Sequence, residues 1–359
     1  MHFPQSTHLR DSCLFSDGRG LFFLALAIFS LAGSRLPAAA EGKLEVTYFD
    51  VGQADAVLVS CPEGKHHLLI DSGDTRYPKS SANFRRFLTN AFTHLPRHLA
   101  VVVASHQHAD HIGSMEWVLK NFQVDTYVDN GDTGDTTTFA NLQAERRRQE
   151  RAGKLTYIKG KDNNFSEVDF CPKVKMEIFL PWATRPALAD QNDRSVAVRL
   201  EYGTPTDGTN SFLFVGDIEG EAEQVMLNQF TEAQRAKLNA DVLKVGHHGS
   251  DTSSRDGFVP AVSPQLAVVS VGKKDTGTNE RYKHPRLSTL REYDTWFKNN
   301  PPLPPLKAPA AKIPAYNADT GEWKLQSRPA GLWLTVKDGT ITVTAEGGKL
   351  GISAVPTQN

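Results

Sequence analysis

The stretch from Ser105 to Gly113 constrains this chain more than any other part of its sequence. Within six positions it places His106, His108, Asp110 and His111, directly after an apolar run over residues 99–104. In an extended segment, residues two apart point to the same side, so His106 and His108 can bind one ion. Asp110 and His111 follow as the chain turns toward a helix, which directs them to a second ion nearby. Imidazole and carboxylate ligands favour zinc or a similar metal, so we predict a metal site with more than one ion.

Several stretches, in order along the chain, resemble one protein family. The H-x-H-x-D-H pattern resembles the signature of the metallo-β-lactamase fold hydrolases. Residues 48–59 and 69–73 resemble the opening hairpin of the subfamily typified by the C-terminal hydrolase domain of the ComEC/Rec2 competence proteins, and residues 214–217 and 243–250 resemble its later motifs. The resemblance covers roughly residues 44 to 300. It implies an α/β fold, a four-layer αβ/βα sandwich.

The resemblance also implies how two divalent metal ions are held. One ion is bound by the two histidines of H-x-H, the second by the Asp and His that follow together with a late histidine, and an aspartate bridges both. Carried onto this chain, the implied ligands are His106, His108, Asp110, His111, Asp217 and His247. The late histidine is assigned to His247 because it directly follows a predicted strand over residues 241–245.

Two neighbours of these ligands receive supporting roles from the same resemblance. His248 is expected to face the substrate or to serve as the metal ligand in place of His247. Asp71 follows a buried strand and is expected to lie beneath the ligands, where it orients one of the histidines that bind metal.

One departure from the family concerns the first metal. Many members supply a further histidine to it, but this chain has no histidine between Ile112 and Asp217. Residues 192–196 resemble the corresponding stretch of the ComEC-like subfamily, so the first metal either has fewer protein ligands or uses Asn192 or Asp193. This departure argues against a true β-lactamase. It also makes manganese plausible beside zinc, since oxygen ligands favour harder ions.

The ligand set predicts a hydrolytic mechanism. The expected nucleophile is a hydroxide that bridges the two metals and attacks a phosphoryl or acyl centre. Asp110 can orient the water or accept its proton. Lys244 can stabilise an oxyanion, or it is a structural lysine at a strand end. His284 lies in a stretch similar to the N-R-Y-G-H-P motif of the subfamily. This resemblance implies that His284 contacts the substrate or its leaving group; the alternative is that His284 belongs to a surface turn without a role in the reaction.

The N-terminus is typical of a signal peptide. The apolar run over residues 21–32 is short for a membrane span, Arg10 and Arg19 precede it, and an A-x-A site ends at Ala40. We expect cleavage after residues 1–40 and export to the periplasm or the medium, so that no stable membrane span remains. The alternative is a retained anchor that tethers the chain to the membrane.

The remaining chain is predicted to form one hydrolase domain over residues 41–350, followed by a tail over 351–359. The proline-rich segment 299–314 predicts an irregular surface excursion. Hydrophobic spacing predicts a helix over 112–122, and Asp338-Gly339 between two alternating runs predicts a hairpin. If the chain is exported, Cys61 and Cys171 can form a disulfide; two unpaired thiols are the alternative.

Charge and resemblance together shape the functional hypothesis. The formal net charge is −1, so nothing in the overall balance indicates nucleic-acid binding. By resemblance, the leading hypothesis is an exported dinuclear hydrolase of phosphodiesters, DNA among them. The alternatives are a hydrolase of esters, thioesters or lactones on the same fold, and a metal-binding protein with little turnover.

The dinuclear hypothesis predicts a metal content. Protein purified from Glu41 onward should bind about two divalent ions, and the Asp217→Ala variant should lose most of one, because its carboxylate is expected to bridge both. Metal analysis of the dialysed proteins measures this directly. Unchanged metal content in the variant would contradict the dinuclear arrangement.

Overall fold

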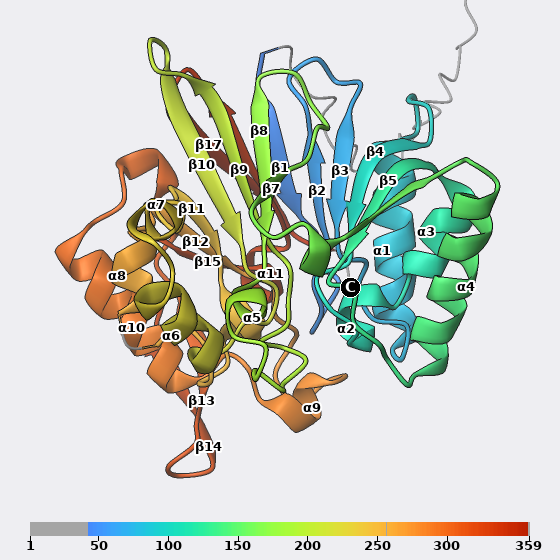
Figure 1. Cartoon of the computed structure of the whole chain (residues 1–359). Helices are drawn as coiled ribbons and strands as arrows, with labels where there is room; N and C mark the ends of the chain where they lie inside the picture. The colour runs from blue at the N-terminus through green and yellow to red at the C-terminus, as the bar shows by residue number, and fades with distance from the viewer. Residues whose placement is uncertain (1–41, 256, 358–359) are drawn as a thin grey trace, which may run out of the picture. The chain divides into compact units, whose positions relative to one another are not determined.

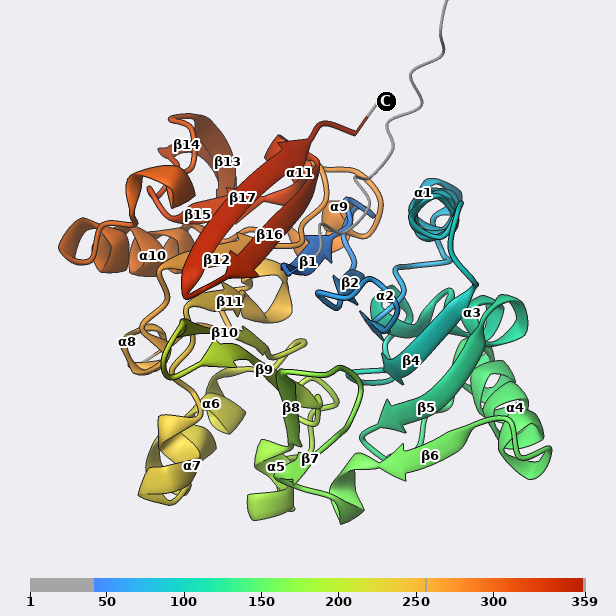
Figure 2. The same cartoon turned by 90° about the horizontal axis from the view of Figure 1, so that it is seen from above.

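Two mixed β-sheets pack face to face, and helices cover their outer faces (Figures 1 and 2). The computed structural model describes residues 42–255 and 257–357. This architecture confirms the predicted αβ/βα sandwich. The predicted signal peptide and its cleavage site lie outside the described residues. Within the described ranges, every helix is too short or too polar to cross a membrane.

The first sheet has eight strands. Strands β3, β4, β5 and β6 run parallel to one another, and the other neighbouring strands pair antiparallel. From edge to edge the strands are β17 Lys349–Val355, β16 Thr340–Glu346, β1 Leu44–Tyr48, β2 Val57–Ser60, β3 His67–Ile70, β4 His98–Val103, β5 Gln123–Asp129 and β6 Thr156–Lys159.

The second sheet has seven strands, of which β15, β12, β11 and β10 run parallel. In order they are β15 Leu332–Leu334, β12 Leu266–Val269, β11 Val242–Lys244, β10 Gly208–Phe214, β9 Ala197–Thr204, β8 Val174–Phe179 and β7 Ser166–Glu167. A separate antiparallel hairpin consists of β13 Lys312–Asn317 and β14 Glu322–Ser327.

Alternating side chains of the first sheet divide the apolar residues into two cores. Val57 and Val59 of β2 belong to the core that joins both sheets, whereas Leu58 belongs to the core beneath the outer helices. This division follows from the two-residue repeat of a strand. Leu69 of β3 and Val102 of β4 also face the helices.

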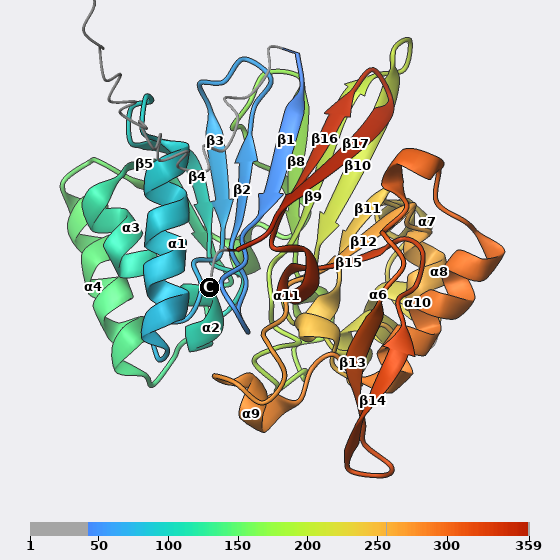
Figure 3. The same ribbon diagram turned by 180° about the vertical axis from the view of Figure 1, so that it is seen from behind.

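The helices complete the outer layers. Figure 3 shows α1 Pro78–Ala91, α3 Met115–Asn121 and α4 Thr137–Arg151 beside the first sheet. The second sheet carries α6 Gly220–Asn228, α7 Glu232–Ala236, α8 Phe258–Val262 and α10 Leu287–Asn299. Short helical turns lie in the connections: α2 Ala109–Ile112, α5 Pro181–Thr184, α9 Asn279–Tyr282, α11 Thr335–Asp338, η1 Gly160–Asp162, η2 Gly246–Gly249 and η3 Pro304–Leu306.

The predicted helix over 112–122 is wrong at its beginning. The helical turn α2 ends at Ile112, and α3 starts at Met115. The break occurs at Gly113, whose N–H donates to the carbonyl of Gly73 at 3.0 Å. A Cβ at Gly113 would lie 2.5 Å from that carbonyl oxygen, so the main chains approach too closely for any other residue.

The hairpin predicted at Asp338-Gly339 is also wrong. The strand before it, β15, pairs with β12 in the second sheet, while β16 pairs with β1 and β17 in the first. The Asp338 carboxylate accepts from the backbone N–H of Leu334 at 2.9 Å and closes a helical turn instead. The chain therefore crosses between the sheets here.

The proline-rich segment is only partly a surface excursion. Three of its apolar residues are buried in the large core that includes side chains of both sheets and of α10: Leu306, Ala308 and Ile313. The chain then enters the β13–β14 hairpin, which the sequence analysis did not predict.

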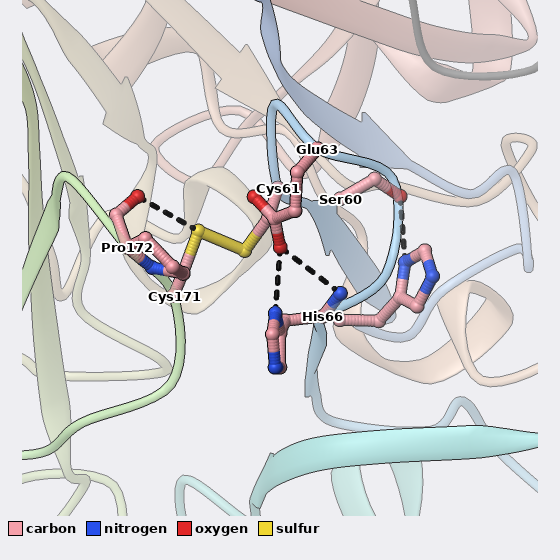
Figure 4. The surroundings of a disulfide bond; sticks show 7 residues. Ser60, Cys61, Glu63, His66, Cys171 and Pro172 are labelled. Atoms are coloured by element: carbon pink, nitrogen blue, oxygen red, sulfur yellow. Dashed lines mark hydrogen bonds and ion pairs between the residues drawn. A yellow bond between two sulfur atoms is a disulfide. The ribbon is translucent and has the colours of Figure 1, made fainter. Parts of the chain in front are cut away.

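Cys61 and Cys171 form a disulfide bond (Figure 4). Cys61 directly follows β2 of the first sheet, and Cys171 lies between β7 and β8 of the second. The bond therefore ties the two sheets together across 110 residues of sequence.

Removing this bond should destabilise the protein. Closing a loop of such length restricts the unfolded chain, so the Cys61→Ala/Cys171→Ala variant should lose about 2–4 kcal/mol of unfolding free energy. Denaturant unfolding of the variant and of the wild type, with and without reductant, measures the difference. Identical unfolding midpoints and slopes for the two proteins would contradict the expectation.

Candidate metal centre

The predicted ligands lie in loops at one end of both sheets. The 104–108 loop follows β4, Asp217 follows β10, and η2 follows β11. In parallel strands the carboxyl ends meet at one edge, so these loops converge. Figure 1 shows α2 and α9 at this end, and a cavity of about 370 Å³ opens between them. Seven candidate residues line it: His108, Asp110, Asn192, Asp217, His247, His248 and His284.

His106 and His108 direct one ring nitrogen each toward a common point. Nε2 of His106 lies 3.0 Å from Nδ1 of His108. Two nitrogens bound to one tetrahedral zinc ion would be roughly 3.3 Å apart, so the spacing fits a shared ion. Burial lowers the pKa of His106 well below its ordinary value, which keeps the ring neutral as a ligand must be.

Two serine hydroxyls hold the opposite edge of His106. Ser105 Oγ lies 3.1 Å and Ser195 Oγ 3.3 Å from its Nδ1. Gly216, with a φ of 55°, allows this approach, because a Cβ there would lie 3.0 Å from both serines. These contacts leave Nε2 of His106 for the ion.

His111 connects two buried carboxylates. Its Nδ1 lies 2.8 Å from Asp71 Oδ2 and its Nε2 3.1 Å from Asp217 Oδ2. Burial alone would lower the pKa of His111, but Asp217 and Asp71 raise it well above the usual value. Burial would likewise raise the pKa of Asp217, yet His111 and His248 hold it well below. Asp217 Oδ1 is buried without a hydrogen-bond partner among the described residues, so it is available to a cation.

Asp71 is buried against His111, one of the predicted ligands. Besides contacting His111, the Asp71 carboxylate accepts from the backbone N–H of Ser105 at 2.8 Å and from the Ser105 hydroxyl at 2.7 Å. It thereby fixes the start of the loop that carries His106.

The two late histidines differ in their surroundings. Nδ1 of His248 donates to the Ser270 carbonyl at 2.9 Å, because a carbonyl can only accept. Nε2 of His248 then carries the lone pair. It is buried and has no hydrogen-bond partner in the described part of the chain. His247 donates from Nδ1 to Glu219 at 2.7 Å and is more exposed.

Ligand atoms of His248, rather than His247, form compact groups with the other candidates. Asp110, His111 and His248 offer atoms within 4.8 Å of one another, as do His106, His111 and Asp217. These groups, together with the unpartnered buried atoms, are compatible with a metal site. His247 contributes a nitrogen 3.8 Å from Asp217.

Asn192 and Asp193 separate in the structure. Asn192 lines the cavity, and its buried Oδ1 has no partner among the described residues. Asp193 accepts from the backbone N–H groups of Glu219 and Ala222, so it caps α6. Burial raises the pKa of Asp193 to about 6. Asn192 is therefore the better placed of the two for a metal or a substrate.

Lys244 and His284 also occupy different positions. Lys244 is 2% exposed and pairs with Asp55 at 2.6 Å, behind His248 and outside the cavity lining. This placement separates it from any oxyanion in the cavity. His284 lines the cavity and is buried, and neither ring nitrogen has a partner in the described part. Burial lowers the pKa of His284 well below its usual value.

Sequence reasoning assigned no role to Asp55, Ser105, Ser195 or Glu219, although all contact predicted ligands or their partners. Asp55 had a visible signal, since it interrupts an apolar stretch in the opening hairpin. Ser195 also had one, because it lies in the 192–196 stretch that resembles the ComEC-like subfamily. Ser105 and Glu219 gave none that assigns a role, because Ser and Glu are common residues and their partners are distant in sequence.

A comparison with known families agrees with this geometry. The family described as "Metallo-beta-lactamase superfamily" matches residues 49–273. The chain belongs to this superfamily. ComE operon protein 3 of Bacillus subtilis is 30% identical over 69% of this chain and 30% of its own length. Competence protein ComA of Neisseria gonorrhoeae is 28% identical over 74% of this chain and 32% of its own. The chain thus spans about a third of these relatives.

Solved structures show weaker likeness to this superfamily member. The CmlA β-hydroxylase E377D mutant has a TM-score of 0.42 and 12% identity, covering 71% of this chain and 50% of that one. The assignment to the superfamily therefore depends on the sequence matches.

The two late histidines can be distinguished by metal content. His248→Ala should lose about one ion per chain, because it removes a ligand atom from the group with Asp110 and His111. His247→Ala should retain both ions. Metal analysis after dialysis against a weak chelator tests the pair, and loss of an ion only from His247→Ala would restore the assignment made from sequence.

Proposed function

We propose that this superfamily member is an exported, two-metal hydrolase of phosphodiesters. The observation that carries the proposal is the convergence of His106, His108, Asp110, His111, Asp217 and His248 on one end of the sandwich. Four of these side chains line a cavity that a substrate can enter.

The first ion is assigned to His106 and His108, with Asn192 Oδ1 as an additional ligand. The second is assigned to Asp110, His111 and His248, and Asp217 contributes to both. When bound, the ions lower the pKa of a water molecule and polarise the bond to be hydrolysed. The nitrogen ligands support zinc, and an oxygen from Asn192 would also suit manganese.

The residues of the cavity have separate tasks in this proposal. Asp110, whose side chain is 12% exposed, orients the attacking water and accepts its proton. His284 presents unpartnered nitrogens to the cavity and is assigned to the substrate or its leaving group. Arg76 lines the cavity 3.5 Å from Asp110 and offers the positive charge that a phosphoryl group requires.

The choice of phosphodiesters, with DNA among them, rests on the resemblance to the hydrolase domain of the ComEC/Rec2 competence proteins and on the likeness to Competence protein ComA. The Cys61–Cys171 disulfide supports export, because such bonds persist in oxidising compartments. The alternative substrates are esters, thioesters and lactones. They are favoured by the pairing of Arg76 with Asp74, which offsets its charge.

A substrate panel separates these possibilities. We expect the zinc- or manganese-loaded protein to hydrolyse bis-p-nitrophenyl phosphate faster than a thioester or a lactone. Asp110→Asn should lower this rate by about 10²–10⁴-fold through loss of proton transfer. Activity confined to the thioester or lactone would select the alternative enzyme, and no turnover across the panel would indicate a metal-binding protein.

A further inference from the structure

Asp55 contacts all three residues assigned to the second metal. Its backbone N–H donates to the carbonyl of Asp110 at 3.1 Å. Its carboxylate lies 3.3 Å from Nδ1 of His248 and 3.9 Å from Nδ1 of His111. The Asp55 side chain is only 4% exposed, so these contacts are shielded from water.

Lys244 fixes the Asp55 carboxylate from the other side. Its Nζ lies 2.6 Å from Asp55 Oδ2 and donates to the carbonyl of Val245 at 2.8 Å. Removing a carboxylate from water is costly unless a cation compensates it. Lys244 thus keeps a charged, oriented carboxylate against His248.

The first metal position is supported by different groups. There the hydroxyls of Ser105 and Ser195 hold His106. Substituting the residues that support one metal position should therefore leave the other position unchanged. A residue that acts through Asp55 should affect one ion and leave the other in place.

We infer that Asp55 and Lys244 are a buried positioning pair for the second metal: the Asp55 carboxylate is held against His248 and near His111, and the Asp55 backbone N–H separately holds the main chain of Asp110. This inference rests on the proposed two-metal site. It assigns Lys244 a task other than contact with an oxyanion. Groups of this kind, behind the direct ligands, typically change metal affinity by about 10–100-fold when replaced.

The test is a zinc titration of the full metal-free chain by calorimetry with a competing chelator. Asp55→Asn/Lys244→Met removes both charges together, so no buried charge is left unpaired. We expect the second dissociation constant to rise by about 10–100-fold and the first to change by less than about threefold. His106→Ala and His248→Ala assign the two constants to their positions.

Arg328→Met is the control for a general loss of stability. It breaks another buried ion pair, with Asp338 at 2.7 Å, that lies outside the cavity lining. Thermal unfolding compares the loss of stability in the two proteins. The control should bind both ions as the wild type does. Lys244→Arg should bind the second ion more tightly than Asp55→Asn/Lys244→Met does, because it retains the positive charge.

The outcomes separate this inference from the proposed function. Suppose that the wild type binds two ions. The positioning pair is then overturned if the double variant binds both ions with wild-type affinity, or if its two affinities fall by the same factor. A wild type that binds fewer than two ions overturns the two-metal proposal and the pair together. Selective loss of the second ion, absent from Arg328→Met, supports the pair.

Discussion

The contact of His111 with Asp71 and Asp217 is the interaction on which the candidate site depends. Asp71 follows β3 of the first sheet, and Asp217 follows β10 of the second. One imidazole ring joins them with separations of 2.8 and 3.1 Å, in a place where all three side chains are nearly excluded from water. The ring therefore fixes how the ends of the two sheets meet, and with that the distance between the other ligand loops.

The surrounding groups extend this arrangement into two supports. On one side, Asp71 binds Ser105, and the serine hydroxyls hold His106. On the other, Asp55 and Lys244 hold His248. The serines contact Nδ1 of His106 and the Ser270 carbonyl accepts from Nδ1 of His248, so Nε2 of each ring remains available. This matters because a histidine binds a metal only through a nitrogen that carries a lone pair.

The sequence predicted the sandwich through its resemblance to one family, and it predicted the strand over residues 241–245 that corresponds to β11. It failed where the outcome depends on contacts between distant segments. The break at Gly113 comes from the close backbone of Gly73. The hairpin expected at Asp338-Gly339 is absent, because its flanking strands pair in different sheets. Neither partner is visible from the local pattern.

For the site, the sequence by itself predicted the chemistry: H-x-H-x-D-H brings four side chains of metal-ligating types together in one short segment. Only the tertiary structure decided which distant residues join them. It grouped His248 rather than His247 with Asp110 and His111, turned Asp193 to cap α6, and buried Lys244 against Asp55. Adjacent histidines look alike in a sequence, and the hydrogen bonds that distinguish them come from Ser270 and Glu219 on other segments.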